Sequence, residues 1–86
     1  MGVTHQVEVR PAAARALRKV HPKDQVRLRG VIALLAANPR PPGAIPLKGR
    51  DAYRVRVGDY RIIYTIQEGA LIVVVVALGH RRDVYR

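Results

Sequence analysis

The segment "YRVRVGDYRIIYTI" (Tyr53–Ile66) decides the fold, because apolar and polar residues alternate along it on both sides of a Gly-Asp pair. Alternation with a period of two is typical of β-strands, and Gly58-Asp59 between two such runs predicts a hairpin with a two-residue turn. That turn sets the cross-strand pairs Val57–Tyr60, Arg56–Arg61 and Val55–Ile62.

This register divides the hairpin into two faces. The apolar face is expected to join the core and carries Tyr53, Val55, Val57, Tyr60, Ile62 and Tyr64. The other face carries Arg54, Arg56 and Arg61, and like charges directly opposite each other destabilise a strand pair. Because a guanidinium group binds phosphate oxygens through two parallel hydrogen bonds, we predict a phosphate-binding surface there. The alternative is a solvated sheet face that is rich in arginine.

A third strand is predicted at "ALIVVVVAL" (Ala70–Leu78), where β-branched residues indicate a buried strand. If Glu68-Gly69 forms a second two-residue turn, the pairs are Thr65–Ile72, Ile63–Val74 and Arg61–Val76. This pairing predicts an exposed apolar strip of Ile72, Val74 and Val76 beside the arginines. Exposed apolar strips often receive a partner.

The N-terminal half predicts one strand and two helices. "THQVEVR" (4–10) alternates like a strand, whereas "PAAARALRKV" (11–20) and "KDQVRLRGVIALLAAN" (23–38) have helical composition and spacing. The prolines of "NPRPPG" (38–43) end the second helix, and "IPLKG" (45–49) is a short edge piece. The predicted class is α+β, with two N-terminal helices packed on a small antiparallel sheet in the order β-α-α-β-β-β. We expect the whole chain, residues 1–86, to form a single domain with this fold.

Charge dominates the composition, with 16 Lys and Arg against 6 Asp and Glu and a net charge of +10. Such a field attracts nucleic acid, anionic membranes or an acidic protein. Cysteine is absent, which excludes disulfides and thiolate metal sites. No signal peptide is visible, and the longest apolar run is shorter than the roughly 20 residues of a membrane span, so we expect a cytoplasmic protein without membrane partners.

The C-terminal "GHRRDVYR" (79–86) brings further groups that suit phosphodiester chemistry. His80 can exchange a proton near neutral pH, Arg81 can stabilise charge on phosphorus, and Tyr85 can stack on a base. Each of these residues alone is a weak signal, and their conjunction carries the prediction. His5 and His21 are expected to be ordinary surface residues.

The chain resembles the RelE/ParE toxin superfamily of bacterial toxin–antitoxin systems, specifically the RelE branch. The resemblance covers nearly the whole chain and is most specific in "YRVRVGDYRIIY" followed by "HRRDVY". It implies the RelE-like fold and a type II toxin that inhibits translation as a ribosome-dependent endoribonuclease. Its implied partners are the ribosome, messenger RNA and an acidic antitoxin, in a higher-order hetero-oligomer.

The resemblance also implies the chemistry, which is attack by a ribose 2′-hydroxyl on the adjacent phosphate without metal or cofactor. Arg54 and Arg56 match two basic positions of the family, and Arg61 matches the arginine that holds the scissile phosphate. Arg81 then assists the leaving oxygen, and Tyr85 lies near the nucleotide. An arginine is a poor base because its pKa exceeds about 12, which favours His80 for proton transfer.

Two other functions stay open. A ParE-like toxin shares the fold but inhibits DNA gyrase and cuts no RNA. A basic RNA-binding module needs the basic face without the C-terminal residues.

Overall fold

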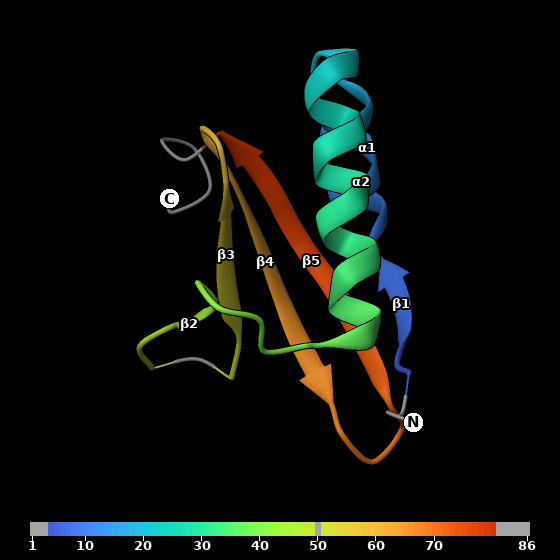
Figure 1. Ribbon diagram of the computed structural model, residues 1–86, viewed down its shortest axis with the longest axis vertical. Helices are drawn as coiled ribbons and strands as arrows, with labels where there is room; N and C mark the ends of the chain where they lie inside the picture. The colour runs from blue at the N-terminus through green and yellow to red at the C-terminus, as the bar shows by residue number, and fades with distance from the viewer. Residues whose placement is uncertain (1–3, 50, 81–86) are drawn as a thin grey trace.

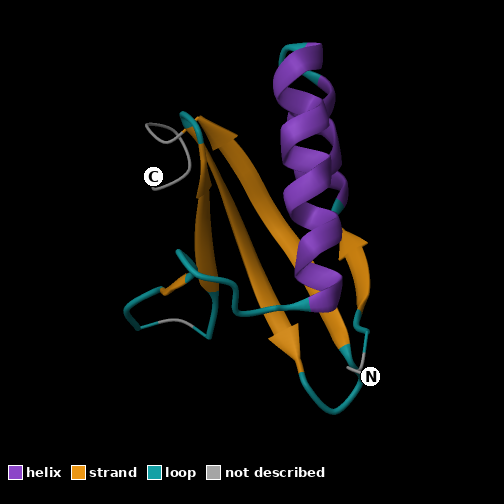
Figure 2. Ribbon diagram, viewed as in Figure 1, coloured by secondary structure: helices purple, strands orange, loops and turns teal. Residues whose placement is uncertain are grey.

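The computed structural model describes residues 4–49 and 51–80. Its elements are β1 (Gln6–Val9), α1 (Pro11–Arg18), α2 (Pro22–Ala37), β2 (Ile45–Pro46), β3 (Tyr53–Val57), β4 (Tyr60–Gln67) and β5 (Ile72–His80). The strands form one sheet in the order β1-β5-β4-β3-β2, and both helices lie on the same side of it (Figures 1 and 2). The predicted α+β class, with two helices packed on a sheet, is confirmed.

Both helices start at a proline. Pro11 and Pro22 each occupy the first turn, where the missing N–H costs no intrahelical hydrogen bond. His21 caps α2, since its Nδ1 accepts a hydrogen bond from the backbone N–H of Lys23 at 3.2 Å. At the other end, the proline that follows Asn38 prevents continuation. His21 is exposed, as expected.

The β3–β4 hairpin has the predicted bounds and register, with Val57 opposite Tyr60 and Arg56 opposite Arg61. Its turn is the Gly58-Asp59 pair, and Gly58 has a φ of +58°. Type II′ hairpin turns need positive φ at their first central residue, which glycine adopts without strain. The sequence at this turn therefore fixes which side chains share a face.

The predicted register between β4 and β5 is wrong. Residues 68–71 connect the strands, so the turn is longer than the Glu68-Gly69 pair that we expected. Thr65 consequently lies opposite Val74, and a register shift between Ile63 and Tyr64 places Arg61 opposite Gly79. The longer turn leaves the alternation of both strands intact. The irregularity leaves Val76 without an opposite residue in β4 and moves the core positions of β5 from Val73 and Val75 to Leu78. A continuous apolar run such as 70–78 does not reveal this shift in the hydrophobic pattern.

The sheet is mixed rather than wholly antiparallel, because β1 pairs with β5 in parallel. β5 is thus an interior strand, with β1 on one side and β4 on the other. Val74 lies between Glu8 of β1 and Thr65 of β4 and is only 5% exposed. The predicted exposed strip of Ile72, Val74 and Val76 is therefore wrong, because Val74 is buried and Ile72 and Val76 are half-buried.

The core lies between the helices and the sheet. Its buried side chains include Ala13 and Leu17 of α1, Leu28, Ile32 and Leu35 of α2, and Val55, Val57, Ile62, Tyr64, Val73, Val75 and Leu78 of the sheet. Each fully buried aliphatic side chain stabilises the fold by about 1.5–3 kcal/mol relative to an exposed one. The apolar face of the hairpin thus packs against the helices, as predicted.

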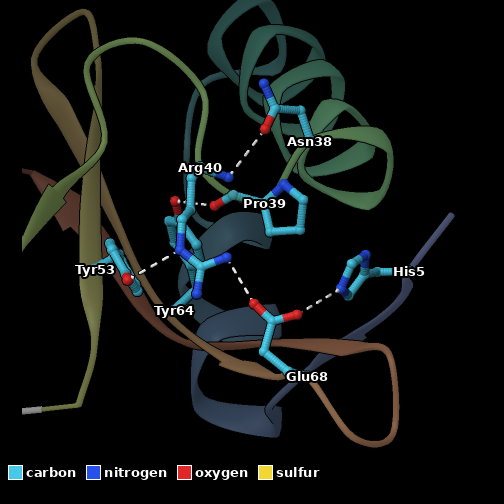
Figure 3. Close-up of polar contacts among 7 residues, drawn as sticks. All are labelled: His5, Asn38, Pro39, Arg40, Tyr53, Tyr64 and Glu68. Carbon is cyan, nitrogen blue, oxygen red and sulfur yellow. Dashed lines mark hydrogen bonds and ion pairs between the residues drawn. The ribbon is translucent and has the colours of Figure 1, made fainter. Parts of the chain in front are cut away.

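A polar cluster joins the loops at one end of the sheet (Figure 3). The Arg40 Nε donates a hydrogen bond to the Tyr53 hydroxyl at 3.1 Å, and its Nη1 donates to Glu68 at 2.6 Å. The Arg40 hydrogen bond and charge, with a smaller contribution from His5, hold the pKa of Glu68 below its usual value. The cluster fastens the α2–β2 loop to the β4–β5 turn.

His5 belongs to this cluster, and its expected surface position is wrong. Its side chain is 9% exposed, and its Nε2 lies 3.7 Å from the Glu68 carboxylate. The backbone N–H of His5 donates to the carbonyl of Ala36 at the end of α2. The pairing of β1 beside β5 explains this burial, since it places the preceding residue next to the β4–β5 turn.

Tyr64 connects the core to the same loops. Its ring stacks on Tyr53, with centroids 5.8 Å apart, and its hydroxyl donates to the carbonyl of Pro39 at 2.7 Å. Burial, together with the neighbouring Tyr53, raises the pKa of Tyr64 from 10 to about 12.

We expect Tyr64 to ionise at a higher pH in the folded protein than an ordinary tyrosine does. Because its folded pKa is the higher one, its contribution to stability is complete below pH 10 and is lost as the pH rises towards about 12. Absorbance titration at 295 nm should show a phenolate step above pH 11 that Tyr64→Phe lacks. Tyr64→Phe should also cost about 1 kcal/mol of unfolding free energy at pH 7. A wild-type titration complete near pH 10 would contradict this assignment.

Candidate functional site

The three sheet arginines line one cavity of about 330 Å³, and they alternate with the core residues of β3 and β4, so this cavity lies on the side of the sheet away from the helices. Its lining residues are Gly43, Ile45, Arg54, Arg56 and Arg61. The predicted gathering of the three arginines is therefore present in the structure.

Two neighbouring strands position these arginines. Arg56 of β3 lies directly opposite Arg61 of β4, and Arg54 lies two residues earlier on the same face of β3. Arg54 and Arg61 are half-buried, whereas Arg56 is exposed. Three cations fixed on a rigid two-stranded frame form a concentrated positive field, which favours an anion with several oxygens.

Gly43 and Ile45 complete the cavity, and sequence reasoning did not identify them. Ile45 pairs with Arg54 across β2 and β3, so its side chain shares the arginine face, and it is 46% exposed. Gly43 has a φ of +93°, a conformation that other residues adopt only with strain. The edge piece at 45–49 was predicted, but its register against β3 depends on a proline-rich loop whose course the sequence does not specify.

The cavity has the chemical features for binding a nucleotide. Guanidinium groups bind phosphate oxygens in bidentate fashion, and an exposed aliphatic side chain beside them offers an apolar contact for a base or ribose. Within the described ranges, no three His, Asp or Glu side chains gather as a metal site would require. The arrangement suits binding a phosphodiester and stabilising negative charge on it.

His80 does not line this cavity. It lies opposite Tyr60 in the β4–β5 register, and directly opposed residues share a face. Tyr60 packs against the core, and the His80 ring meets it edge-on with centroids 6.0 Å apart. His80 therefore lies at the same end of the sheet as Arg61 but on the other face.

The remaining predicted site residues, Arg81 and Tyr85, lie outside the described residues. In the described part of the chain, neither helix combines the length and apolar character needed to cross a membrane.

Comparison with solved structures finds close similarity in fold to chains of two RelE–RelB-type complexes and to YafQ. The chain shares 26% identity with a chain of the RelBE2 toxin–antitoxin complex of Mycobacterium tuberculosis, covering 94% of this chain and 95% of that one, with a TM-score of 0.83. For the archaeal RelE–RelB complex of Pyrococcus horikoshii the identity is 27%, the coverage 93% and 98%, and the TM-score 0.83. For YafQ of E. coli the identity is 15%, the coverage 95% and 99%, and the TM-score 0.77.

No curated protein sequence matches the chain significantly. A family model does match, over residues 7–85, and it describes the ParE toxin of the type II toxin–antitoxin system parDE. The match spans all elements from β1 to β5 except the first residue of β1. The chain therefore belongs to the ParE toxin family of type II toxin–antitoxin systems, within the RelE/ParE superfamily.

Proposed function

We propose that this toxin is a ribosome-dependent endoribonuclease that cleaves messenger RNA in the decoding site and so inhibits translation. The observation that carries the proposal is the cavity shared by Arg54, Arg56 and Arg61. The structural similarity to RelE toxins and to YafQ supports it at the level of the fold. The activity would place the protein in the cytoplasm, where translation occurs.

In the proposed reaction, the ribose 2′-oxygen attacks the adjacent phosphorus and the bond from phosphorus to the 5′-oxygen breaks. The products are a 2′,3′-cyclic phosphate and a 5′-hydroxyl. The 2′-hydroxyl loses one proton and the leaving 5′-oxygen gains one, so no net proton is consumed. Negative charge increases on the phosphorane oxygens during attack. Arg61, flanked by Arg56 and Arg54, would stabilise that charge, since preorganised cations contribute most where charge develops. The nucleophile belongs to the substrate, so the reaction requires no metal or cofactor.

The placement of His80 favours an electrostatic mechanism over general-base catalysis by this residue. His80 lies on the face opposite the arginine cavity and contacts the Tyr60 ring. A general base must come within hydrogen-bond reach of the proton that it removes. We therefore assign charge stabilisation and substrate alignment to the three cavity arginines. We further propose that Arg81 assists the leaving oxygen and that Tyr85 lies near the nucleotide.

The proposed protein partner is an acidic antitoxin. The similar structures from M. tuberculosis and P. horikoshii are complexes of a toxin with an antitoxin. A chain with a net charge of +10 attracts a partner of opposite charge. We propose that such a partner joins this chain in a higher-order hetero-oligomer.

Inhibition of DNA gyrase is the second candidate function, because the family model that matches is that of the ParE toxin. This alternative requires no phosphodiester chemistry and gives no role to an arginine cavity. The two candidates therefore differ in what substitution of Arg61 should do.

Expression of the wild-type chain in a translation extract should produce new messenger RNA ends in phase with codons. Arg61→Ala should lower the cleavage rate about 100-fold, the typical effect of removing one group that stabilises transition-state charge. Arg29→Ala is the matched control, since Arg29 is exposed on α2 and does not line the cavity. Intact transcripts combined with gyrase inhibition would contradict the nuclease proposal in favour of the second candidate.

His80→Ala should retain cleavage within about tenfold of wild type, because the side chain lies on the face away from the cavity. The measurement is the single-turnover cleavage rate on programmed ribosomes between pH 6 and 8. A loss as large as that of Arg61→Ala, with a pH profile that flattens in the variant, would show that His80 transfers the proton.

RNA binding provides an independent measurement of the cavity. Arg54→Gln and Arg61→Gln should each lower the slope of log affinity against log salt by about 0.7 for single-stranded RNA, because each removes one phosphate contact. Fluorescence anisotropy with a labelled oligonucleotide measures this slope, and Arg29→Gln should leave it unchanged. Equal slopes in all variants would show that the cavity does not hold phosphate.

A further inference from the structure

The α2–β2 loop connects the two sides of the sheet. It begins at the end of α2, on the side that the helices cover, and it leads to β2 at the sheet edge (Figure 1). At its far end, Gly43 and the first residue of β2, Ile45, line the arginine cavity on the other side. The position of this cavity wall therefore depends on what holds the loop.

Arg40 holds the loop from the helix side of the sheet (Figure 3). Its guanidinium donates to the Tyr53 hydroxyl at 3.1 Å and to Glu68 at 2.6 Å, and it lies 5.5 Å from the centroid of the Tyr53 ring. The carbonyl of the preceding residue, Pro39, accepts a hydrogen bond from the Tyr64 hydroxyl at 2.7 Å. Both tyrosines pack with the core, so these contacts lie on the face opposite the arginine cavity. Arg40 does not line that cavity.

The segment between Arg40 and the cavity wall is stiff. The backbone N–H of Ala44 donates to the carbonyl of Pro41 at 3.0 Å, which closes a four-residue turn. Pro42 and Gly43 are its central residues, and the φ of +93° at Gly43 fits a type II turn, which favours proline and then glycine at these places. Because proline fixes its own φ, a displacement at Arg40 is transmitted along this segment rather than absorbed by it.

Ile45 is placed to contact a base. It lies directly opposite Arg54 across β2 and β3, and the Cβ atoms of such a pair are about 4.5–5.5 Å apart. Its side chain is 46% exposed, and a Cβ on the neighbouring Gly43 would meet nothing within 4 Å. When the arginines hold a phosphate, the base of the attached nucleoside is the part that matches this apolar surface. A base is accessible for such a contact only where it is unpaired and unstacked.

We propose that Arg40 is a positioning residue of the arginine cavity and holds Ile45 where it contacts an unpaired base beside the bound phosphate. Arg40 itself touches neither the base nor the phosphate and acts through the loop. The inference rests on the proposed function for its substrate, single-stranded RNA. The three arginines would bind any phosphodiester, whereas Ile45 would distinguish an unpaired nucleotide from a bare phosphate.

The test uses the full chain and a dinucleoside monophosphate in which the 2′-hydroxyl next to the phosphate is methylated, so that it cannot be cleaved. Two further probes lack the base on the 5′ side or on the 3′ side, and inorganic phosphate is the fourth. Titrations followed by NMR give a Kd for each probe. Wild type should bind the intact probe about tenfold more tightly than one of the two abasic probes, the usual effect of one base contact.

Ile45→Ala should raise the Kd of the intact probe about fivefold and should leave the Kd of that abasic probe within about twofold of wild type, because only the intact probe offers the base. Ile45→Val keeps the branched apolar side chain and should restore binding to within about twofold of wild type. Val26→Ala is the matched control, since Val26 is exposed on α2 and does not line the cavity. Equal losses for the intact and both abasic probes would overturn the base contact.

Arg40→Met and Glu68→Ala should both raise the Kd of the intact probe about threefold or more, because each releases the loop. Both should leave inorganic phosphate binding within about twofold, and both should fold, since exposed ion pairs contribute little to stability. The first variant lowers the net charge and the second raises it, so an effect of charge alone predicts opposite changes in Kd and would overturn the positioning role. Arg29→Met, which removes an exposed charge on α2, is the control and should match wild type.

The outcomes separate this inference from the nuclease proposal. If wild type cleaves no RNA but the variants lose the intact probe as expected, the nuclease proposal fails and the roles of Ile45 and Arg40 stand. If wild type cleaves RNA but binds the intact and abasic probes equally, the nuclease proposal stands and this inference fails. Absence of binding between wild type and the intact probe overturns the inference as well.

Discussion

The two-residue turn at Gly58-Asp59 is the constraint on which the rest of the structure depends. It fixes Val57 against Tyr60, and every residue of the hairpin then has a determined face. A slip of one residue would move Arg56 and Arg61 into the core and expose the tyrosines, at a cost of several kcal/mol for each unpaired buried charge. The same turn thus secures both the hydrophobic core and the convergence of the arginines.

Local patterns in the sequence were sufficient to predict the hairpin, both helices and the grouping of the arginines. Each depends on contacts between near neighbours, where alternation or helical spacing carries the information. The partners of β5 depend on non-local contacts. The parallel pairing with β1 and the longer turn at 68–71 have no local signature, and they account for the wrong register and for the burial of Val74.

The error at β5 also changes the interpretation of the site. Sequence proximity to the C-terminal arginine cluster suggested that His80 joins the sheet arginines. The irregularity that leaves Val76 without an opposite residue in β4 interrupts the alternation along β5, and His80 consequently shares the face of Tyr60. Gly43 and Ile45 reach the cavity through the proline-rich loop, whose course depends on the cluster of Arg40, Glu68 and His5. Long-range polar contacts of this kind leave no periodic signal in a sequence.

The hairpin register also explains why the arginine face suits an anion. It fixes Arg56 directly opposite Arg61, where two like charges repel each other across the strand pair. Sliding the strands by one residue would relieve that repulsion only by burying both guanidinium groups, so the core holds the arginines together. In the described part of the chain, β2 pairs with only the first two residues of β3, and Arg56 lies beyond that pairing at the margin of the cavity. An anion with several oxygens would offset the repulsion by accepting hydrogen bonds from more than one guanidinium. The packing that stabilises the fold thus preorganises a positive surface, which is the property that a charge-stabilising site requires.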